Sequence, residues 1–238
     1  SAFYDCIGLT SVVIPEGVTN IGESVFWGCT GLIEVSMPAR VKSIADWIFR
    51  GCTSLTEFSI PEGVTSIGEG AFWGCSSLTE VSIPDSVTSI SDSVFSSCIG
   101  LTKVEIPNGV TSIGGSAFWG CIGLTEISIP GTVKNISWNT FNGCTGLTKV
   151  VILDGVETIA AYTFFHCRDL TMIKLPGTLT GIGICALEGC SNIVDLTVSV
   201  NATAKGSDLE NRRLTDDLNK KVISMQQMLA TAGLNSEC

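Results

Sequence analysis

The chain has 238 residues, of which 45% are hydrophobic and 15% are charged, a composition that excludes a disordered protein. Its formal net charge of −10 comes from the first 200 residues, which contain 18 acidic and 8 basic side chains. Such an acidic surface repels phosphate groups, so we expect no nucleic-acid partner. No apolar run approaches the roughly 18 residues that a membrane span requires.

One pattern of 23 residues recurs along most of the chain, and cysteine marks it. Nine cysteines stand 23 residues apart: Cys6, Cys29, Cys52, Cys75, Cys98, Cys121, Cys144, Cys167 and Cys190. A period of roughly 20 to 29 residues with apolar residues spaced as L-x-x-V-x-I is typical of a leucine-rich-repeat solenoid. The first six residues align with the middle of a repeat, so we interpret the chain as a piece of a longer protein.

Each repeat is predicted to begin with a strand, which in the fourth repeat starts at Leu78 and ends before Pro84. Val81 and Ile83 are predicted to point inward and Ser82 outward, because successive side chains of a strand alternate between its faces. Proline cannot donate to the ladder of hydrogen bonds and therefore ends the strand. Strands of successive repeats are predicted to stack into a parallel sheet with a concave outer face.

The second half of each repeat is predicted to return along the other face of the core. It contains two inward residues three apart, such as Val64 and Ile67. The apolar spacing of Val94, Phe95 and Cys98 then predicts one short helical turn against the core. The predicted fold is therefore a β-rich repeat solenoid, right-handed and curved, with a parallel concave sheet and short helical turns.

The repeat decays near residue 200, so we predict a solenoid over residues 1–200 and a different segment over 201–238. The sequence Ser207-Asp-Leu-Glu210 is a capping-box pattern, which predicts the start of a C-terminal α-helix after a linker. Apolar residues follow at helical spacing: Leu214, Leu218, Val222, Met225 and Leu229. This amphipathic helix either caps the last repeat or docks on another chain.

The repeat unit closely resembles the BspA-like, or treponemal-type, leucine-rich repeats. The stretches Phe72-Trp-Gly-Cys75-Ser-Ser-Leu78 and Ile60-Pro61-Glu-Gly-Val64-Thr-Ser-Ile67 carry the match, which covers about three quarters of the chain. The resemblance implies a curved solenoid with an adhesive or scaffold function, because such repeats occur in bacterial surface proteins that bind host matrix or other cells. The family shares no catalytic residues, so none is carried over to this chain.

The nine periodic cysteines occupy one structural position beside the repeat phenylalanine. We interpret them as buried thiols, since cysteine packs well as a small apolar group. A ladder of disulfides is the alternative, but an odd number of parallel-stacked cysteines does not suit the geometry of the bond. Metal binding is a third interpretation, which the absence of histidine from the column disfavours. Cys185 and Cys238 lie outside this column.

Outward positions of the predicted sheet carry the first set of candidate binding residues. One position per repeat is mostly charged: Glu34, Glu57, Glu80, Lys103, Glu126 and Lys149. Repeat arrays commonly bind partners through their concave face, which predicts a partner-binding surface here. The alternative is a face that only keeps the protein soluble.

Tryptophan supplies the second set, because Trp27, Trp73 and Trp119 recur at one offset in every second repeat. Exposed aromatic rings there would suggest a contact for a protein or a sugar. The alternative is that each ring lies flat over the edge of the next repeat. Trp47 and Trp138 stand at neighbouring offsets and would extend the same patch.

A third periodic set consists of the carboxylates Glu23, Asp46, Glu69 and Asp92. Stacked carboxylates could hold Ca²⁺, although hard cations need several converging oxygens, and we favour a solvated face. His166 is the single histidine, with no nucleophile motif around it. We therefore expect no catalytic residue, no metal and no cofactor.

Two hypotheses of function remain open. The first is a non-enzymatic interaction module that presents the sheet, and the tryptophans, to a protein or glycan partner; the resemblance favours cell-surface adhesion. The second is an intracellular scaffold subunit of a larger assembly, docked through the C-terminal helix.

Overall fold

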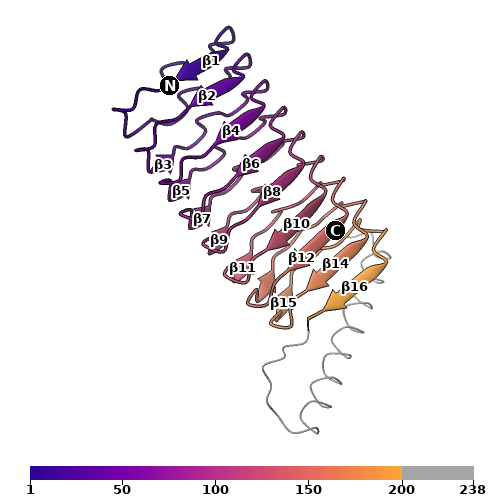
Figure 1. Cartoon of the computed structure of the whole chain (residues 1–238). Coiled ribbons are helices and arrows are strands. Elements are labelled where there is room, and N and C mark those ends of the chain that lie inside the picture. The colour runs from indigo at the N-terminus through magenta and orange to yellow at the C-terminus, as the bar shows by residue number, and fades with distance from the viewer. Residues whose placement is uncertain (200–238) are drawn as a thin grey trace, which may run out of the picture.

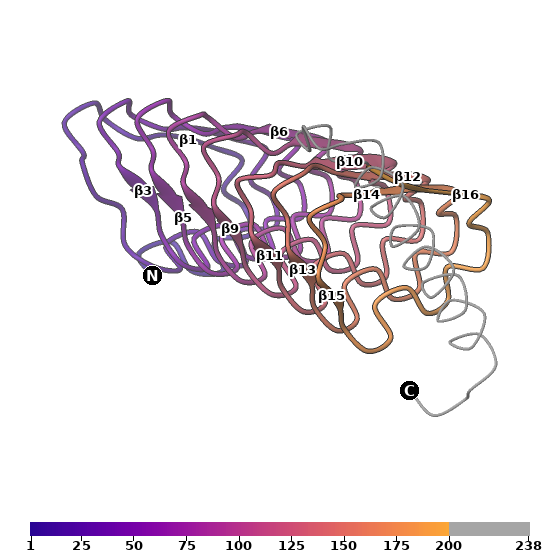
Figure 2. The same ribbon diagram turned by 90° about the horizontal axis from the view of Figure 1, so that it is seen from below.

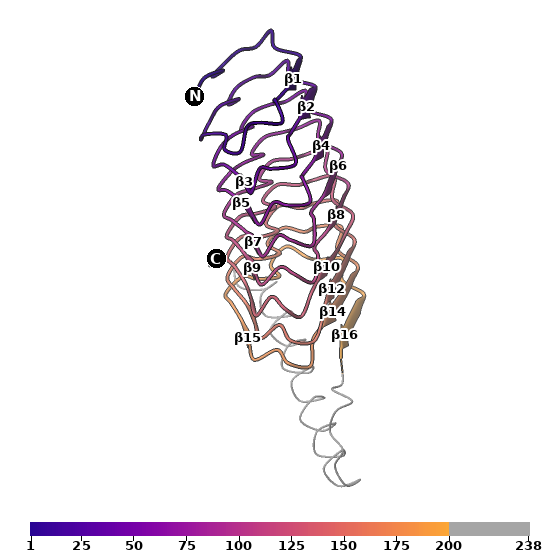
Figure 3. The same ribbon diagram turned by 60° about the vertical axis from the view of Figure 1, so that its left-hand side comes forward.

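A computed structural model describes residues 1–199, in which each repeat forms one coil of an elongated stack (Figures 1 and 3). Each coil contributes one strand to a first series, which follows the repeat leucine as predicted. These strands are β1 (Ser11–Val13), β2 (Glu34–Ser36), β4 (Glu57–Ser59), β6 (Glu80–Ser82), β8 (Lys103–Glu105), β10 (Glu126–Ile129), β12 (Lys149–Ile152), β14 (Met172–Leu175) and β16 (Asp195–Val198).

Within each sheet of the first series, neighbouring strands pair in parallel, and each paired residue lies opposite its equivalent in the next repeat. Glu57 is paired with Glu80, and Glu80 with Lys103. The series divides into three hydrogen-bonded sheets, β1-β2, β4-β6-β8 and β10-β12-β14-β16. The predicted alternation is confirmed, because Val81 is buried and Ser82 is exposed.

A second sheet lies on another side of the stack, and the spacing of inward residues does not by itself predict it (Figure 2). Its order is β15-β13-β11-β9-β7-β5-β3. The predicted inward residues of this stretch are confirmed, since Val64 and Ile67 are fully buried. The strands have two residues each: β3 (Ser43–Ile44), β5 (Ser66–Ile67), β7 (Ser89–Ile90), β9 (Ser112–Ile113), β11 (Asn135–Ile136), β13 (Thr158–Ile159) and β15 (Gly181–Ile182).

The prediction of a short helical turn before each cysteine is wrong, and no helix occurs in residues 1–199. An α-helix requires each N–H to donate to the carbonyl four residues earlier. Here the N–H of Phe95 donates to the carbonyl of Ala117 in the next coil at 2.8 Å. Ser93 and Ser97 also have φ angles of 57° and 59°, which a right-handed helix does not allow. The segment is a set of tight turns joined to its neighbours by hydrogen bonds.

Phenylalanine forms the centre of the core, as the repeat pattern predicts. Consecutive rings stack with centroids 5.2 to 5.6 Å apart. Burying each ring contributes about 1.5–3 kcal/mol before the entropy cost of ordering it. The rings are all shielded from solvent: Phe26, Phe49, Phe72, Phe95, Phe118, Phe141 and Phe164.

The cysteine column confirms the prediction of core thiols for eight of its nine members, while Cys6 in the terminal coil is exposed. All nine are free thiols, so the alternative of a disulfide ladder is wrong. The buried thiols donate to phenylalanine carbonyls, as Cys98 does to Phe72 at 3.1 Å. Burial, and then the neighbouring Cys29, raise the pKa of Cys52 to about 12.

Residues 201–238, with the predicted linker and apolar helix, lie outside the described part of the chain. The domain boundary at residue 200, the handedness and the curvature of the solenoid stay predictions. Within residues 1–199, no helix has the length and apolar character that crossing a membrane would require.

Candidate functional site

The outward residues of the first strand series, here called the sheet face, include all six charged residues selected from the sequence. Each is exposed and stands at the first position of its strand, from β2 to β12. The paired strands have no shift in register, and every coil repeats after 23 residues, so equivalent residues form one row that runs across the three sheets. The structure therefore brings these side chains together on one rigid surface: Glu34, Glu57, Glu80, Lys103, Glu126 and Lys149.

The row begins with three consecutive carboxylates, Glu34, Glu57 and Glu80, called the acidic rungs. Glu57 and Glu80 lie opposite each other on paired strands, which are about 4.8 Å apart in a parallel sheet, and like charges placed in this way are destabilising. Glu34 stands at the equivalent position of β2, in the neighbouring sheet. Among the ion pairs of residues 1–199, none involves an acidic rung. Glu80 also lies opposite Lys103 and interacts with its charge, so Glu34 and Glu57 are the rungs that have no cation opposite them.

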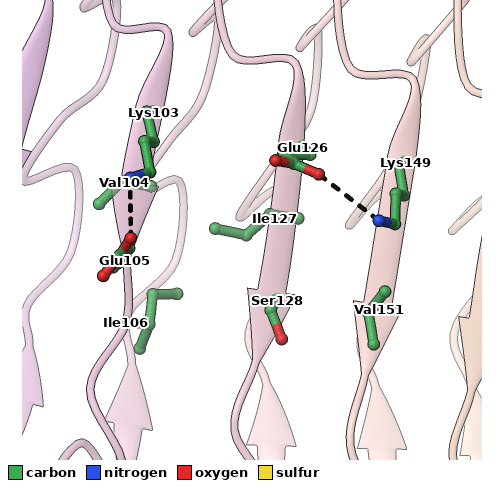
Figure 4. A pocket seen from close by; sticks show the side chains of 9 residues that line it. All are labelled: Lys103, Val104, Glu105, Ile106, Glu126, Ile127, Ser128, Lys149 and Val151. Atoms are coloured by element: carbon green, nitrogen blue, oxygen red, sulfur yellow. Dashed lines mark ion pairs between the residues drawn. The ribbon is translucent and has the colours of Figure 1, made fainter.

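From β8 onward the row alternates in sign and borders a hollow of about 340 Å³ (Figure 4). The Nζ atom of Lys103 lies 2.8 Å from Oε1 of Glu105 on the same strand and donates a hydrogen bond to it. This hydrogen bond raises the pKa of Lys103. Lys149 lies 3.6 Å from Glu126 on the adjacent strand. All four side chains are exposed by about half or more, from 48% to 79%, so water screens the pairs. A charged partner could replace either of these contacts at little cost.

Threonines beside the charged row are used within the solenoid. The hydroxyl of Thr102 donates to the carbonyl of Thr79 at 3.1 Å, and that of Thr148 to Thr125 at 3.0 Å. Each hydroxyl therefore closes a contact between neighbouring coils. This leaves the charged row as the more available part of the sheet face for a partner.

The tryptophans selected from the sequence lie on the side formed by the turns, away from the sheet face. Trp27, Arg50 and Trp73 occupy the same position in three successive coils. The Cζ atom of Arg50 is 4.3 Å from the ring centroid of Trp27 and 3.8 Å from that of Trp73. The sequence left open that each tryptophan ring lies flat over the edge of the next repeat. At Trp27 and Trp73 the guanidinium of Arg50 lies between the two rings. Trp119 is 43% exposed.

Sequence reasoning missed the role of Arg50, although writing out each repeat position as a column places it between two tryptophans. Trp47 joins this group, with its ring 5.6 Å from that of Trp73 and 5.1 Å from Arg50 Cζ. The expectation that Trp47 extends the patch is thus confirmed. Trp138 is 54% exposed and lies against Gly115, where a Cβ atom would be 2.6 Å from its indole nitrogen.

The periodic carboxylates have a structural use. Asp46 accepts a hydrogen bond from the N–H of Glu69 at 2.8 Å, and Asp92 accepts one from Gly115 at 2.7 Å. Each aspartate thus satisfies a backbone donor of the following coil. Within residues 1–199, no group of three or more His, Cys, Asp or Glu side chains is placed to hold a metal ion.

Comparison with known proteins identifies the repeat. The family described as the BspA type Leucine rich repeat region matches residues 1–125 and 88–209, in six copies. No curated protein matches the chain.

Two solved structures are similar over most of the chain. A leucine-rich repeat protein of T. pallidum is 27% identical, with a TM-score of 0.62, over 87% of this chain and 83% of that one. A leucine-rich cell surface protein of Faecalibacterium prausnitzii is also 27% identical, with a TM-score of 0.53, over 85% of this chain. The match spans 63% of the F. prausnitzii chain.

Proposed function

The chain belongs to the BspA-type leucine-rich repeat family, and from this premise we propose that it is a non-enzymatic module that binds a protein partner through the sheet face. The similar F. prausnitzii protein is a cell surface protein, which supports recognition at a cell surface as the setting. Repeat arrays suit this task because their stacked strands form an extended, preorganised surface.

The observation that carries the proposal is the line of acidic rungs. Glu57 and Glu80 are directly paired and exposed, and neither forms an ion pair within the described residues, although Lys103 lies opposite Glu80 on the next strand. A partner that brings lysine or arginine side chains to this row relieves the repulsion between the carboxylates. The partner is therefore a protein with a basic surface, and the alternating charges from Lys103 to Lys149 set how it is aligned.

Docking through the predicted C-terminal helix, and with it the scaffold hypothesis, depends on residues outside the described part. Both stay predictions, as does a glycan partner, and no observation in residues 1–199 favours them over the sheet face.

The test is the neutralisation of the acidic rungs in the triple variant Glu34→Gln, Glu57→Gln and Glu80→Gln. A partner captured by the wild type from its native cell surface is identified, and its dissociation constant is measured by surface plasmon resonance. Loss of three desolvated charge contacts weakens binding by at least about tenfold, and the loss shrinks as salt screens the charges.

The matched control removes three exposed acids elsewhere in the repeats, with the substitutions Glu16→Gln, Glu62→Gln and Asp85→Asn. Both variants change the net charge equally, and both must keep the wild-type circular dichroism spectrum. Unchanged affinity in the sheet variant would overturn the proposal. An equal loss in both variants would show a general effect of net charge instead.

A further inference from the structure

A groove crosses the outer side of the second sheet, which is separate from the sheet face (Figure 2). It has a volume of about 470 Å³, and residues of five successive coils line it, from Asp46 to Ser137. Neighbouring coils are about 4.8 Å apart, so the lining extends over roughly 19 Å along the stack. This second-sheet groove is defined by three serines and three carboxylates: Ser89, Ser91, Ser112, Asp46, Glu69 and Asp92.

The serines of the groove have hydroxyl groups that the fold does not use. Among residues 1–199, the hydroxyls of Ser89, Ser91 and Ser112 take part in no hydrogen bond. The adjacent Thr111 differs, because its hydroxyl donates to the carbonyl of Thr88 at 3.1 Å. Each unused hydroxyl both donates and accepts hydrogen bonds. The groove therefore offers donors as well as acceptors to a ligand.

The carboxylates at the side of the groove are held in place by the backbone. Oδ1 of Asp92 accepts from the N–H of Gly115 at 2.7 Å, and Oδ1 of Asp46 accepts from Glu69 at 2.8 Å. Gly114 leaves the room that Asp92 occupies, since a Cβ atom there would overlap Oδ1. Among the ion pairs of residues 1–199, none involves these carboxylates. They are therefore oriented acceptors that a ligand can use.

An exposed aromatic ring lies beside one end of the groove. Trp138 directly follows Ser137 of the lining and is 54% exposed. Its indole lies against Gly115, where a Cβ atom would be 2.6 Å from the ring nitrogen. Gly115 is also the residue that donates to Asp92. The ring and the last carboxylate of the groove thus meet at the same glycine.

We propose that the second-sheet groove binds a neutral oligosaccharide. Sugar hydroxyls donate to carboxylates and both donate to and accept from serine hydroxyls, while the C–H face of a sugar ring packs on an indole. A cation would leave the serine donors without acceptors, and an acidic glycan would be repelled by the carboxylates. The site is independent of the sheet face, so both ligands can be bound at once.

The test titrates the whole chain with neutral tetrasaccharides of glucose, mannose, galactose and N-acetylglucosamine, each in α- and β-linked forms. NMR follows the indole N–H signal of Trp138, and calorimetry gives the dissociation constant. At least one tetrasaccharide is expected to shift this signal in a saturable way. It is expected to bind at least about fivefold more tightly than its monosaccharide, which reaches only part of the lining.

Two substitutions locate the ligand. Ser112→Leu fills the groove and is expected to abolish binding; the equivalent position of β11 is Asn135, so the sheet accepts a longer side chain there. Trp138→Ala is expected to weaken binding roughly tenfold. Trp119→Ala is its matched control, an exposed tryptophan outside the groove, and is expected to leave the affinity unchanged. Circular dichroism checks each variant.

Two further variants separate charge from position. Asp92→Asn retains an oxygen for the N–H of Gly115 but loses the charge, and is expected to weaken binding about threefold. Asp85→Asn removes an exposed carboxylate outside the groove and is expected to have no effect. The triple variant of the acidic rungs is expected to retain full oligosaccharide binding, because the sheet face is a different surface.

The proposal is overturned if no tetrasaccharide binds, if binding survives in folded Ser112→Leu, or if Trp138→Ala and Trp119→Ala lose affinity equally. Loss of binding in the triple variant of the acidic rungs would place the sugar on the sheet face instead. A shift of the Trp138 signal by spermidine or Ca²⁺, but by no tetrasaccharide, would assign the groove to cations.

Discussion

At the scale of single residues, the buried thiols show how one side chain serves both packing and hydrogen bonding. Each fills a small space beside the phenylalanine stack. Its thiol donates to the carbonyl of the phenylalanine 26 residues earlier in the chain, which belongs to the preceding coil. Removal from water disfavours the thiolate, which raises the pKa values of Cys52, Cys75 and Cys98. We therefore expect these three buried thiols to be unreactive, unlike the exposed Cys6 of the same column.

We predict that thiol reagents at pH 8 modify Cys6 in the folded protein and spare Cys52, Cys75 and Cys98. The reason is that the reactive species is the thiolate, and these three are buried with raised pKa values. Mass spectrometry of labelled peptides checks this, with guanidinium-unfolded protein as the control in which all four react.

The same shift has a consequence for stability. Because the pKa of Cys52 rises from 9.0 to about 12 on folding, the folded protein binds more protons than the unfolded chain between these values. The free energy of unfolding is therefore expected to fall as pH rises from 9 to 12. Modification of Cys52 in the native state at pH 8, at the rate of Cys6, would contradict both statements.

At the scale of elements, the turn segment depends on backbone angles that most residues avoid. Gly143 has φ of 74°, and its N–H donates to the carbonyl of Phe165 in the next coil at 2.8 Å. This conformation lets the turn bond to its neighbour while the chain reverses toward the next strand. The helix that the apolar spacing predicts would use those N–H groups internally and separate the coils.

We predict that Gly143→Ala lowers the free energy of unfolding by about 1–2 kcal/mol, since a Cβ atom disfavours positive φ. Space is not the cause, because the nearest atom to an added Cβ is the Cα atom of Gly120 at 3.8 Å. Gly17→Ala is the control, with open space and no positive φ, and is expected to change stability by less than about 0.5 kcal/mol. Urea unfolding measures the change in the free energy of unfolding for both variants. Equal changes in Gly143→Ala and Gly17→Ala would contradict the explanation by backbone strain.

At the scale of the whole molecule, the solenoid is a one-dimensional stack in which each coil contacts its neighbours. Every strand pair joins residues 23 apart, in both the first series and the second sheet. Stability is therefore close to a sum over coils and the interfaces between them. We therefore expect the fold to tolerate the removal of a whole coil, provided that the pattern of inward and outward residues is continuous where the two ends are joined.

We predict that deletion of residues 78–100, one repeat, leaves a folded and shorter solenoid with a lower free energy of unfolding. The junction keeps Leu101 in the place of Leu78, so inward residues stay inward. Deletion of residues 78–89 is the contrasting variant, since it moves apolar side chains to the surface and is expected to aggregate. Circular dichroism and size-exclusion chromatography distinguish the two, and equal behaviour would contradict the modular description.

The repeat by itself determined the parallel sheet of the first strand series, the inward and outward positions, the phenylalanine stack and the thiol column. It could do so because a fixed period places equivalent residues above one another, and burial follows from their apolar character. The row from Glu34 to Lys149 is predictable for the same reason, since outward positions of stacked strands must align.

The tertiary structure decided the second sheet, the absence of helical turns and the group around Arg50. Apolar spacing tells which side chains point inward, but it does not tell whether a backbone N–H bonds within its own turn or with the next coil. A long side chain such as Arg50 can also point in several directions. The rings of Trp27, Trp47 and Trp73, which surround the guanidinium, select the direction that is observed.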